Sequence, residues 1–422
     1  MIEEGDRIAS ETAEAIARRS YGKLVAFLAA RTGDVARAED ALSEAFAAAL
    51  VDWPKNGIPA SPEAWLMAVA KRKIIDMARR RKTGEAAADH LKLMADEMEA
   101  NGEPAEIPDN RLALMFACAH PAIDTGIRAP MILQTLLGFD AGAIASAFLV
   151  SPAAMGQRLA RAKHKIREAG IAFAIPARAD LPERLDAVLA AIYAAFAQSW
   201  SDFAGAEIGR GNLAEEAMWL GRLVVSLLPE EPEALGLLAL MLHSDSRRTA
   251  RRGTQGEYVP LAEQNSALWK SGTIEDAEGL LFQAARMGSL GRYQLEAAVQ
   301  SVHAARRITG RTDWQAIEKL YDALAAICES PVVAINRAVA IAEVRGPEAG
   351  ILALDELADD DRLAQYQPYW AACADLLTRA GKRRAAEEAY EQAIGLERDP
   401  AVRAFLQQRR AQLRSNGSSS PS

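Results

Sequence analysis

The residues of this sequence most suited to a chemical task are basic side chains spaced along a short stretch near position 160. They are Arg158, Arg161, Lys163, Lys165 and Arg167. No acidic residue interrupts them before Glu168, and apolar residues from Met155 to Ile166 form the opposite stripe of the same predicted helix. Such a helix would bind phosphate groups, because each phosphate that a cation neutralises releases counterions.

A tight turn joins this basic helix to a shorter helix before it. Ile144, Ala147 and Phe148 have the spacing of one helix face. Ser151 is a favourable N-cap, and Pro152 suits the first helical position. A short turn between two helices is typical of a helix-turn-helix, whose second helix enters the major groove of DNA. The alternative is a surface helix whose charges are merely solvated, but the turn favours DNA binding.

A second basic group ends the helix that Ser61 and Pro62 begin. Its members are Lys71, Arg72, Lys73, Arg79, Arg80, Arg81 and Lys82. The only acid among them is Asp76. About two or three cations would complement the negative end of a helix dipole, so we interpret the excess as a further set of phosphate contacts.

An acidic helix is predicted just before this one, in residues 34–53. Val35, Leu42 and Phe46 line one side of it, and the other side carries acids. The segment 52–61 is rich in proline, glycine and asparagine and is predicted to be a loop.

Composition indicates an all-helical protein of several domains. The chain has 422 residues, of which 50% are hydrophobic, and few β-branched runs. Cys118, Cys328 and Cys373 lie far apart, which excludes a disulfide framework or a zinc module and fits a reducing compartment. The polar N-terminus is no signal peptide, and no apolar run approaches the ~20 residues of a membrane span. We therefore expect a cytoplasmic protein without membrane contact.

The net charge of −8 limits where a nucleic acid could bind. An acidic chain does not attract a polyanion over its whole surface, so the local basic stripes are the expected contacts.

Residues 10–170 resemble a bacterial sigma factor of the extracytoplasmic-function group. The resemblance lies in DVARAEDALSEAFAAAL, AWLMAVAKRKIIDMARRRK and VSPAAMGQRLARAKHKIR. The sequence departs from the family pattern at Arg72, where asparagine is common, at Ala154, where threonine is common, and at Gly156, where lysine is common.

The resemblance implies two small helical sigma domains joined by a flexible acidic linker, 83–108. Domain 10–82 would correspond to sigma region 2, and domain 109–170, with the helix-turn-helix, to region 4. The implied partners are the clamp and flap of core RNA polymerase and promoter DNA. The segment 52–61 stands where the family builds a pocket for an unstacked base of the −10 element.

The same resemblance assigns residues to each contact. The residues for core polymerase are Asp34, Glu39, Asp40 and Glu44. Those for the −10 element are Lys71, Arg72, Lys73, Arg79 and Arg80. Those for the −35 element are Ala154, Gln157, Arg158, Arg161, Lys163 and Lys165. Gln157 and Arg158 suit base edges, and the later cations suit phosphates.

Residues 181–410 are predicted to be an α-solenoid of tetratricopeptide-like helix pairs. The segment 369–400 fits the tetratricopeptide spacing best, and 336–357 is a weaker helix–Gly–helix unit. Residues 411–422 are predicted to be a disordered tail. Sigma factors with such extensions use them for regulation, which implies a regulatory partner or ligand for this domain.

We therefore expect a sigma factor that directs promoter-specific initiation and that its C-terminal domain regulates. The alternative is a helical-repeat regulator that senses a ligand or partner and uses the helix-turn-helix as an operator binder. His243, Asp245, Arg247, Arg248 and His303 are polar residues of the C-terminal half. They show no nucleophile or metal-ligand spacing, so we expect no enzyme, no catalytic residue, no metal and no cofactor.

Overall fold

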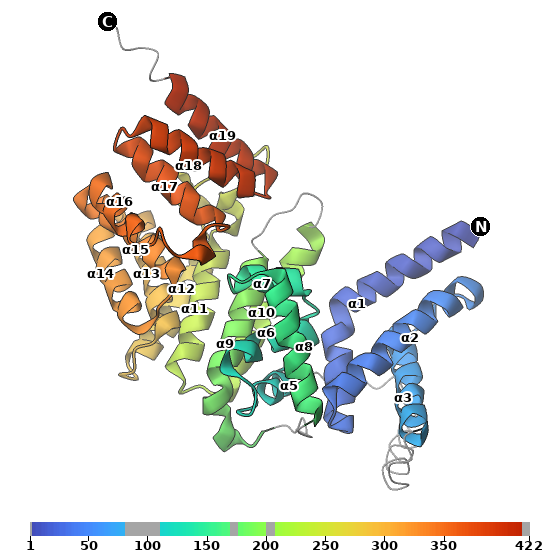
Figure 1. The fold of residues 1–422 in the computed structure, drawn as a ribbon. Helices are drawn as coiled ribbons and strands as arrows, with labels where there is room; N and C mark the ends of the chain where they lie inside the picture. Colours follow the sequence, from blue (N-terminus) through green and yellow to red (C-terminus); the bar gives the residue numbers. More distant parts are fainter. Residues whose placement is uncertain (1, 81–109, 169–175, 200–206, 416–422) are drawn as a thin grey trace, which may run out of the picture. The chain divides into compact units, whose positions relative to one another are not determined.

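A computed structural model describes residues 2–80, 110–168, 176–199 and 207–415. All regular elements of these residues are helices, apart from one isolated bridge between Arg252 and Tyr258 (Figure 1). The all-α prediction is confirmed. The chain divides into two compact units, Met1–Ala191 and Ile192–Ser422, which are described separately. No helix in these ranges is long and apolar enough to cross a membrane.

Three helices form the first part of unit 1. They are α1 (Ile2–Thr32), α2 (Val35–Asn56) and α3 (Pro62–Arg80), and α1 packs against both of the others. Their shared core holds large apolar side chains that are almost fully buried, including Phe27, Leu42, Trp53 and Leu66. The helix α2 begins where the carboxylate of Asp34 accepts a hydrogen bond from the amide of Arg37 at 3.0 Å.

The loop predicted at 52–61 is shorter than expected, because α2 continues to Asn56 through Pro54. Proline lacks the N–H that would bond to the carbonyl of Leu50. Leu50 is on the exposed side of α2, at 48% exposure, where water can solvate that carbonyl. Trp53 instead points inward and packs edge-on against Trp65, with ring centroids 5.6 Å apart. The loop that was predicted to receive an unstacked base therefore comprises only residues 57–61.

Four shorter helices form the second part of unit 1. They are α5 (Arg111–Cys118), α6 (Thr125–Leu137), α7 (Ala141–Ala147) and α8 (Pro152–Glu168). Asp140 caps α7 through the amides of Gly142 and Ala143, and the hydroxyl of Ser151 accepts a bond from the amide of Ala154 at 3.2 Å. The turn from α7 to α8 places Leu149 at a φ of 52°, in the left-handed region. Two helices separated by a tight turn are present at the predicted residues.

The two parts of unit 1 pack against each other through α1, α5 and α6. At the closest point, α1 contributes Gly22 and α6 contributes the backbone of Leu136. A side chain at position 22 would overlap the carbonyl oxygen of Leu136, so only glycine permits this approach.

Unit 2 contains the later helices of the chain. After α9 (Leu181–Gln198) they are α10 (Glu207–Leu227), α11 (Pro232–Ser246), α12 (Ser271–Ala285), α13 (Arg292–Thr309), α14 (Trp314–Ile327), α15 (Pro331–Arg345), α16 (Pro347–Asp355), α17 (Gln367–Arg379), α18 (Arg383–Leu396) and α19 (Pro400–Ser415). From α10 onwards, each helix packs against the next one in the chain (Figure 1). That nearest-neighbour pattern is what a solenoid of stacked helices requires.

Small residues allow the last helix pair to pack closely. Gly381, in the turn after α17, has a φ of 70°. The core between α17, α18 and α19 combines the small residues Ala374 and Ala389 with Tyr390 and Leu406. The weaker helix–Gly–helix unit of the prediction corresponds to α15 and α16, joined at Gly346.

Two predicted boundaries differ from the structure. The compact units meet within α9, whereas the sequence places the start of the C-terminal domain at residue 181. The helix α19 continues to Ser415, so residues 411–415 are helical and not part of a tail. The predicted linker, 83–108, and residues 416–422 lie outside the described residues.

Replacing Gly350 with alanine should destabilise unit 2. The added Cβ would lie 2.6 Å from Cβ of Ala342 and 2.8 Å from Cδ1 of Leu376, which is too close without backbone movement. We expect a loss of about 1–3 kcal/mol in the free energy of unfolding, measured by denaturant titration. Gly279→Ala is the control, because nothing lies within 4 Å of its Cβ, and it should be neutral or slightly stabilising. Equal stability of the two variants would contradict the close packing at Gly350.

Candidate nucleic-acid interface

Three of the predicted cations of α8 share one exposed face. Arg158, Arg161 and Lys165 follow each other at intervals of three and four residues, so their side chains point the same way. They border a cavity of about 330 Å³ between α8 and the start of α6. Its remaining lining residues are Ala122, Ile123, Asp124, Gly126, Ile127, Ala162 and Ile166.

None of these three cations has a carboxylate partner among the residues described. Nε of Arg161 donates a hydrogen bond to the carbonyl oxygen of Gln157 at 3.4 Å. Asp124, beside the cavity, accepts a hydrogen bond from the amide of Gly126 through Oδ1 at 3.0 Å and forms no ion pair with the three cations. Exposed cations that no acid neutralises form a surface that attracts phosphate. Gln157 is exposed and Ala154 half-buried at the start of the same helix.

Lys163 is separated from this face. Its Nζ lies 3.0 Å from Oε2 of Glu39 on α2, and the lysine side chain is 30% exposed. Lys163 was predicted to contact DNA and Glu39 to contact polymerase. The structure therefore pairs two residues that the sequence assigns to different partners. The spacing of residues along the sequence does not indicate this pair, because 124 positions separate Lys163 from Glu39.

The predicted −10 residues of α3 have unequal surroundings. Nζ of Lys73 pairs with Oε2 of Glu44 on α2 at 2.8 Å. Lys71 is half-buried over the ring of Phe27, and its pKa is lowered by burial and by the charge of Arg31. Arg72 is exposed. The side chains of Arg79 and Arg80 lie outside the described residues.

The four predicted polymerase-binding acids also differ in exposure. Asp40 is exposed, and Glu44 remains 48% exposed while it pairs with Lys73. One carboxylate oxygen of Asp34 accepts the hydrogen bond that caps α2. Glu39 is only 15% exposed because Lys163 covers it, and its charge helps burial to raise the pKa of Tyr21.

The polar residues of the C-terminal half serve its own packing. Asp245 pairs with Arg248 at 2.8 Å and with Lys270 at 3.3 Å. Burial and the charge of Arg247 lower the pKa of both His243 and His303 to about 4, so both rings are neutral at pH 7. The described residues contain no group of three potential metal ligands.

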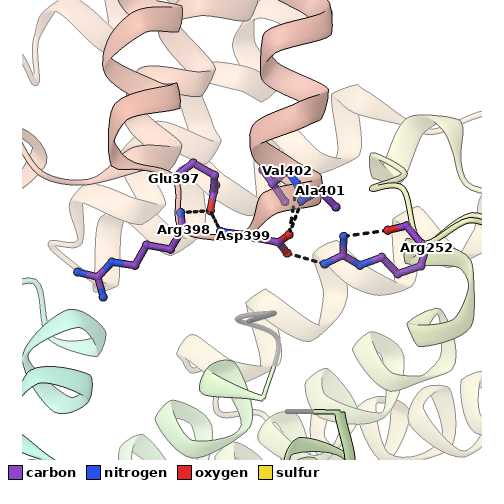
Figure 2. Close-up of polar contacts among 7 residues, drawn as sticks. Arg252, Glu397, Arg398, Asp399, Ala401 and Val402 are labelled. Carbon is purple, nitrogen blue, oxygen red and sulfur yellow. Dashed lines mark hydrogen bonds and ion pairs between the residues drawn. The ribbon is translucent and has the colours of Figure 1, made fainter. Parts of the chain in front are cut away.

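One contact that sequence reasoning missed ties distant parts of unit 2 together. Arg252, in the segment after α11, forms an ion pair with Asp399, and Asp399 also accepts a bond from the amide of Ala401 at the start of α19 (Figure 2). Nearby, Tyr258 packs edge-on against Phe405 with ring centroids 5.4 Å apart. The sequence offers no signal for this pair, because 147 positions separate its members.

Comparison with known proteins defines the class. The sequence profile of sigma-70 region 2 matches residues 16–83, and a family of unknown function, DUF6596, matches residues 184–285. The chain is 37% identical over 375 residues to an uncharacterised protein of Rhizobium meliloti (strain 1021), covering 87% of this chain and 88% of that protein. No solved structure matches.

The chain belongs to the sigma-70 family and has the layout of an extracytoplasmic-function sigma factor with a C-terminal helical extension. Members of this family are transcription-initiation subunits and not enzymes, and their partners are core RNA polymerase and promoter DNA.

Two substitutions at Asp399 should separate its roles. Asp399→Asn keeps an oxygen that can cap α19 but removes the charge that Arg252 binds, whereas Asp399→Ala removes both. Because the pair is largely shielded from solvent, we expect α19 amides to exchange hydrogen faster in Asp399→Asn, with a further loss of about 1 kcal/mol in Asp399→Ala. Exchange rates in α19 equal to the wild type in both variants would show that the pair contributes nothing.

Proposed function

We propose that this sigma factor recognises the −35 element through α8 and the −10 element through α3, and that α2 binds the clamp of core polymerase. The observation that carries the proposal is the exposed face of Arg158, Arg161 and Lys165, which lacks any carboxylate partner in the described ranges. Elsewhere in the chain arginines have close carboxylates, as Arg337 has Asp322 at 2.7 Å. This difference between arginines with and without a carboxylate partner supports the proposal that α8 binds an anion from outside the chain.

The cavity beside α8 supports phosphate binding at this face. Three cations border it, and its floor is apolar, with Ile123, Ile127 and Ile166 among the lining residues. An apolar floor holds the aliphatic parts of the long cationic side chains, so their charged ends stay at the surface. Arg158 shares this face with the phosphate-binding candidates, while Gln157 precedes it at the beginning of the helix.

The acids of α2 support the proposed polymerase contact. Asp40 is exposed and Glu44 nearly half-exposed, on a helix whose opposite side is buried against α1 and α3. Carboxylates held on a rigid, buried helix present fixed negative charges to a basic partner.

A regulatory role for unit 2 rests on its independence. It has its own apolar cores, such as the cluster of Ile335, Leu354 and Leu376, and it is a separate compact unit from the one that carries the α2, α3 and α8 surfaces. A stacked-helix domain offers an extended surface to a partner or ligand.

A second candidate function is direct operator binding by the free protein. The exposure of Arg158, Arg161 and Lys165 in the isolated chain favours it, because nothing in the described residues covers them. A gel shift on duplex DNA with and without core polymerase separates the two functions. Tight, sequence-specific binding by the free protein would favour the operator binder, and binding that requires polymerase would favour the sigma subunit.

Arg158→Ala should weaken transcription that depends on the −35 element. Loss of a base contact costs about 1–3 kcal/mol, measurable as reduced open-complex formation on a cognate promoter. Arg384→Ala is the matched control, since Arg384 is 94% exposed on α18 and carries the same charge. Equal promoter output from both variants would rule out the proposed docking of α8.

Removing residues 199–422 should leave polymerase binding intact but change promoter output. Truncation after Gln198 preserves α9 and the whole of unit 1. The measurement is competition with the housekeeping sigma factor for purified core polymerase, followed by transcription in vitro. Loss of polymerase binding by a truncated protein that keeps its helical content would show that unit 2 is part of the binding surface.

A further inference from the structure

Arg247, directly after α11, is a partly buried cation of unit 2 that has no carboxylate partner among the described residues. Its Nη2 donates a hydrogen bond to Oε1 of Gln300 on α13 at 2.7 Å, and that oxygen belongs to a neutral amide. Burial, and then the charge of Arg251, lower the pKa of Arg247 to about 10, so the guanidinium still carries its charge at pH 7. Removing a charge from water is unfavourable unless an opposite charge accompanies it.

Arg292, at the start of α13, shows the arrangement that Arg247 lacks. Its Nε lies 2.7 Å from Oε1 of Glu296, one turn further along the same helix. Burial acts to lower the pKa of Arg292, but the charge of Glu296 more than offsets that effect and the pKa is raised. The pKa values of the two arginines shift in opposite directions because only Arg292 has an acid beside it.

A second cation near Arg247 is also bonded only to neutral groups. The guanidinium of Arg306, on α13, donates hydrogen bonds to backbone carbonyl oxygens in the segment 261–264, the closest at 3.0 Å. Arg306 and Arg251 each act to lower the pKa of Arg247, so positive charges lie together here. This part of unit 2 therefore has a positive field that its own described acids do not neutralise.

His243 lies one turn before Arg247 on α11 and is 2% exposed. Neither of its ring nitrogens forms a hydrogen bond. The nearest carboxylate oxygen, Oε1 of Glu278, is 3.5 Å from Nε2 and accepts a hydrogen bond from the hydroxyl of Ser301 at 2.6 Å. Burial, and then the charge of Arg247, lower the pKa of His243, so the ring lies in the field of the same cation. Buried polar groups are rarely left without a bond, so the ring is available to a bound molecule.

Two tyrosines complete the cluster, and its outer members reach solvent. Tyr193 and Tyr258 are both close enough to Arg247 to affect its pKa, and their hydroxyls can donate hydrogen bonds. Arg247, Gln300 and both tyrosines are partly exposed, so a small solute can approach them. Two guanidinium groups without an acid match an oxyanion with two negative charges. The fixed N–H donors of arginine suit the oxygens of a phosphate group.

We propose that Arg247 and Arg306, with Tyr193 and Tyr258 beside them, bind a phosphate dianion, either free or carried by a small ester. The binding site rests only on contacts within unit 2, and its effect on transcription rests on the regulatory role proposed above for that unit. Tyr258 also packs against Phe405 of α19, so a bound phosphate would touch the segment that joins α11 to the last helix of the solenoid.

The test is calorimetric titration of the full-length protein with inorganic phosphate in chloride buffer of constant ionic strength. We expect one saturable site in the wild type. Arg247→Met removes the central charge and should weaken binding roughly tenfold or more. Arg384→Met is the matched control, because Arg384 is 94% exposed on α18, and it should bind phosphate as the wild type does. Absence of saturable binding by the wild type would overturn the proposal.

The cations of α8 could bind phosphate as well, so a further variant locates the site. Arg158→Ala should retain the calorimetric response. Loss of that response in Arg158→Ala, together with its survival in Arg247→Met, would place the anion on α8 and overturn the proposal. Titration with glycerol 3-phosphate distinguishes the source of the phosphate group: tighter binding than inorganic phosphate assigns an ester, and weaker binding assigns free phosphate.

Gln300→Glu provides an independent test that does not remove the arginine. The new side chain has the same shape and places a carboxylate where the amide oxygen now lies 2.7 Å from Arg247. This internal anion should raise the thermal midpoint of unfolding without phosphate and abolish phosphate binding. Unchanged phosphate affinity in Gln300→Glu would contradict the site. If circular dichroism shows that Arg247→Met fails to fold, this variant decides.

Transcription in vitro separates the site from the proposed regulation. Promoter output by the wild type should change with phosphate at constant ionic strength, and output by Gln300→Glu should not respond. If phosphate binds as expected and promoter output stays constant, the site stands and regulation through it is wrong.

Discussion

Attraction between opposite charges is the constraint on which unit 1 depends. Unit 1 carries an acidic helix, α2, and a basic helix, α8, so opposite charges can bind each other within it. Here the attraction is limited to selected residues: Glu39 binds Lys163 and Glu44 binds Lys73, while Asp40 and the face of Arg158 stay exposed. The pairing therefore leaves part of the acidic helix and part of the basic helix exposed.

Arginine side chains have different surroundings in the two units. In unit 2 arginines commonly have a carboxylate close by, as in the Arg252–Asp399 pair and the contact of Arg379 with Glu343 at 2.6 Å. These pairs join helices that are distant in the sequence, so the charges contribute to the shape of the solenoid. On α8, Arg158 and Arg161 have no carboxylate partner among the described residues. Structural arginines therefore differ from candidate nucleic-acid contacts in having a carboxylate partner within the chain. The number of arginines in a segment does not distinguish the two.

Backbone proximity is as important as charge in this protein. Gly22 and Gly350 are both helical glycines at which an added methyl group would collide with a neighbouring helix. Alanine-rich helices with an occasional glycine can approach closely, because little side-chain volume separates their axes. Gly22 sets the contact between the two parts of unit 1, and Gly350 sets the packing of α16 on α15 and α17.

The sequence by itself determined the helices, their caps and the class of protein. Those features depend on local chemistry: the apolar period, the N-cap oxygen of Ser151, and the short segments that resemble sigma factors. It failed where local signals compete, as at Pro54, which lies inside α2 because the exposed side of the helix tolerates it.

Only the tertiary structure decided which charged residues are available to a partner. Periodicity assigned Lys163 to the same basic helix as Arg158, but contact with Glu39 sets it apart. The ion pair of Arg252 with Asp399 likewise appears only when the solenoid is assembled. The physical reason is that an ion pair depends on distance in space, and residues more than a hundred positions apart in a sequence give no sign of that distance.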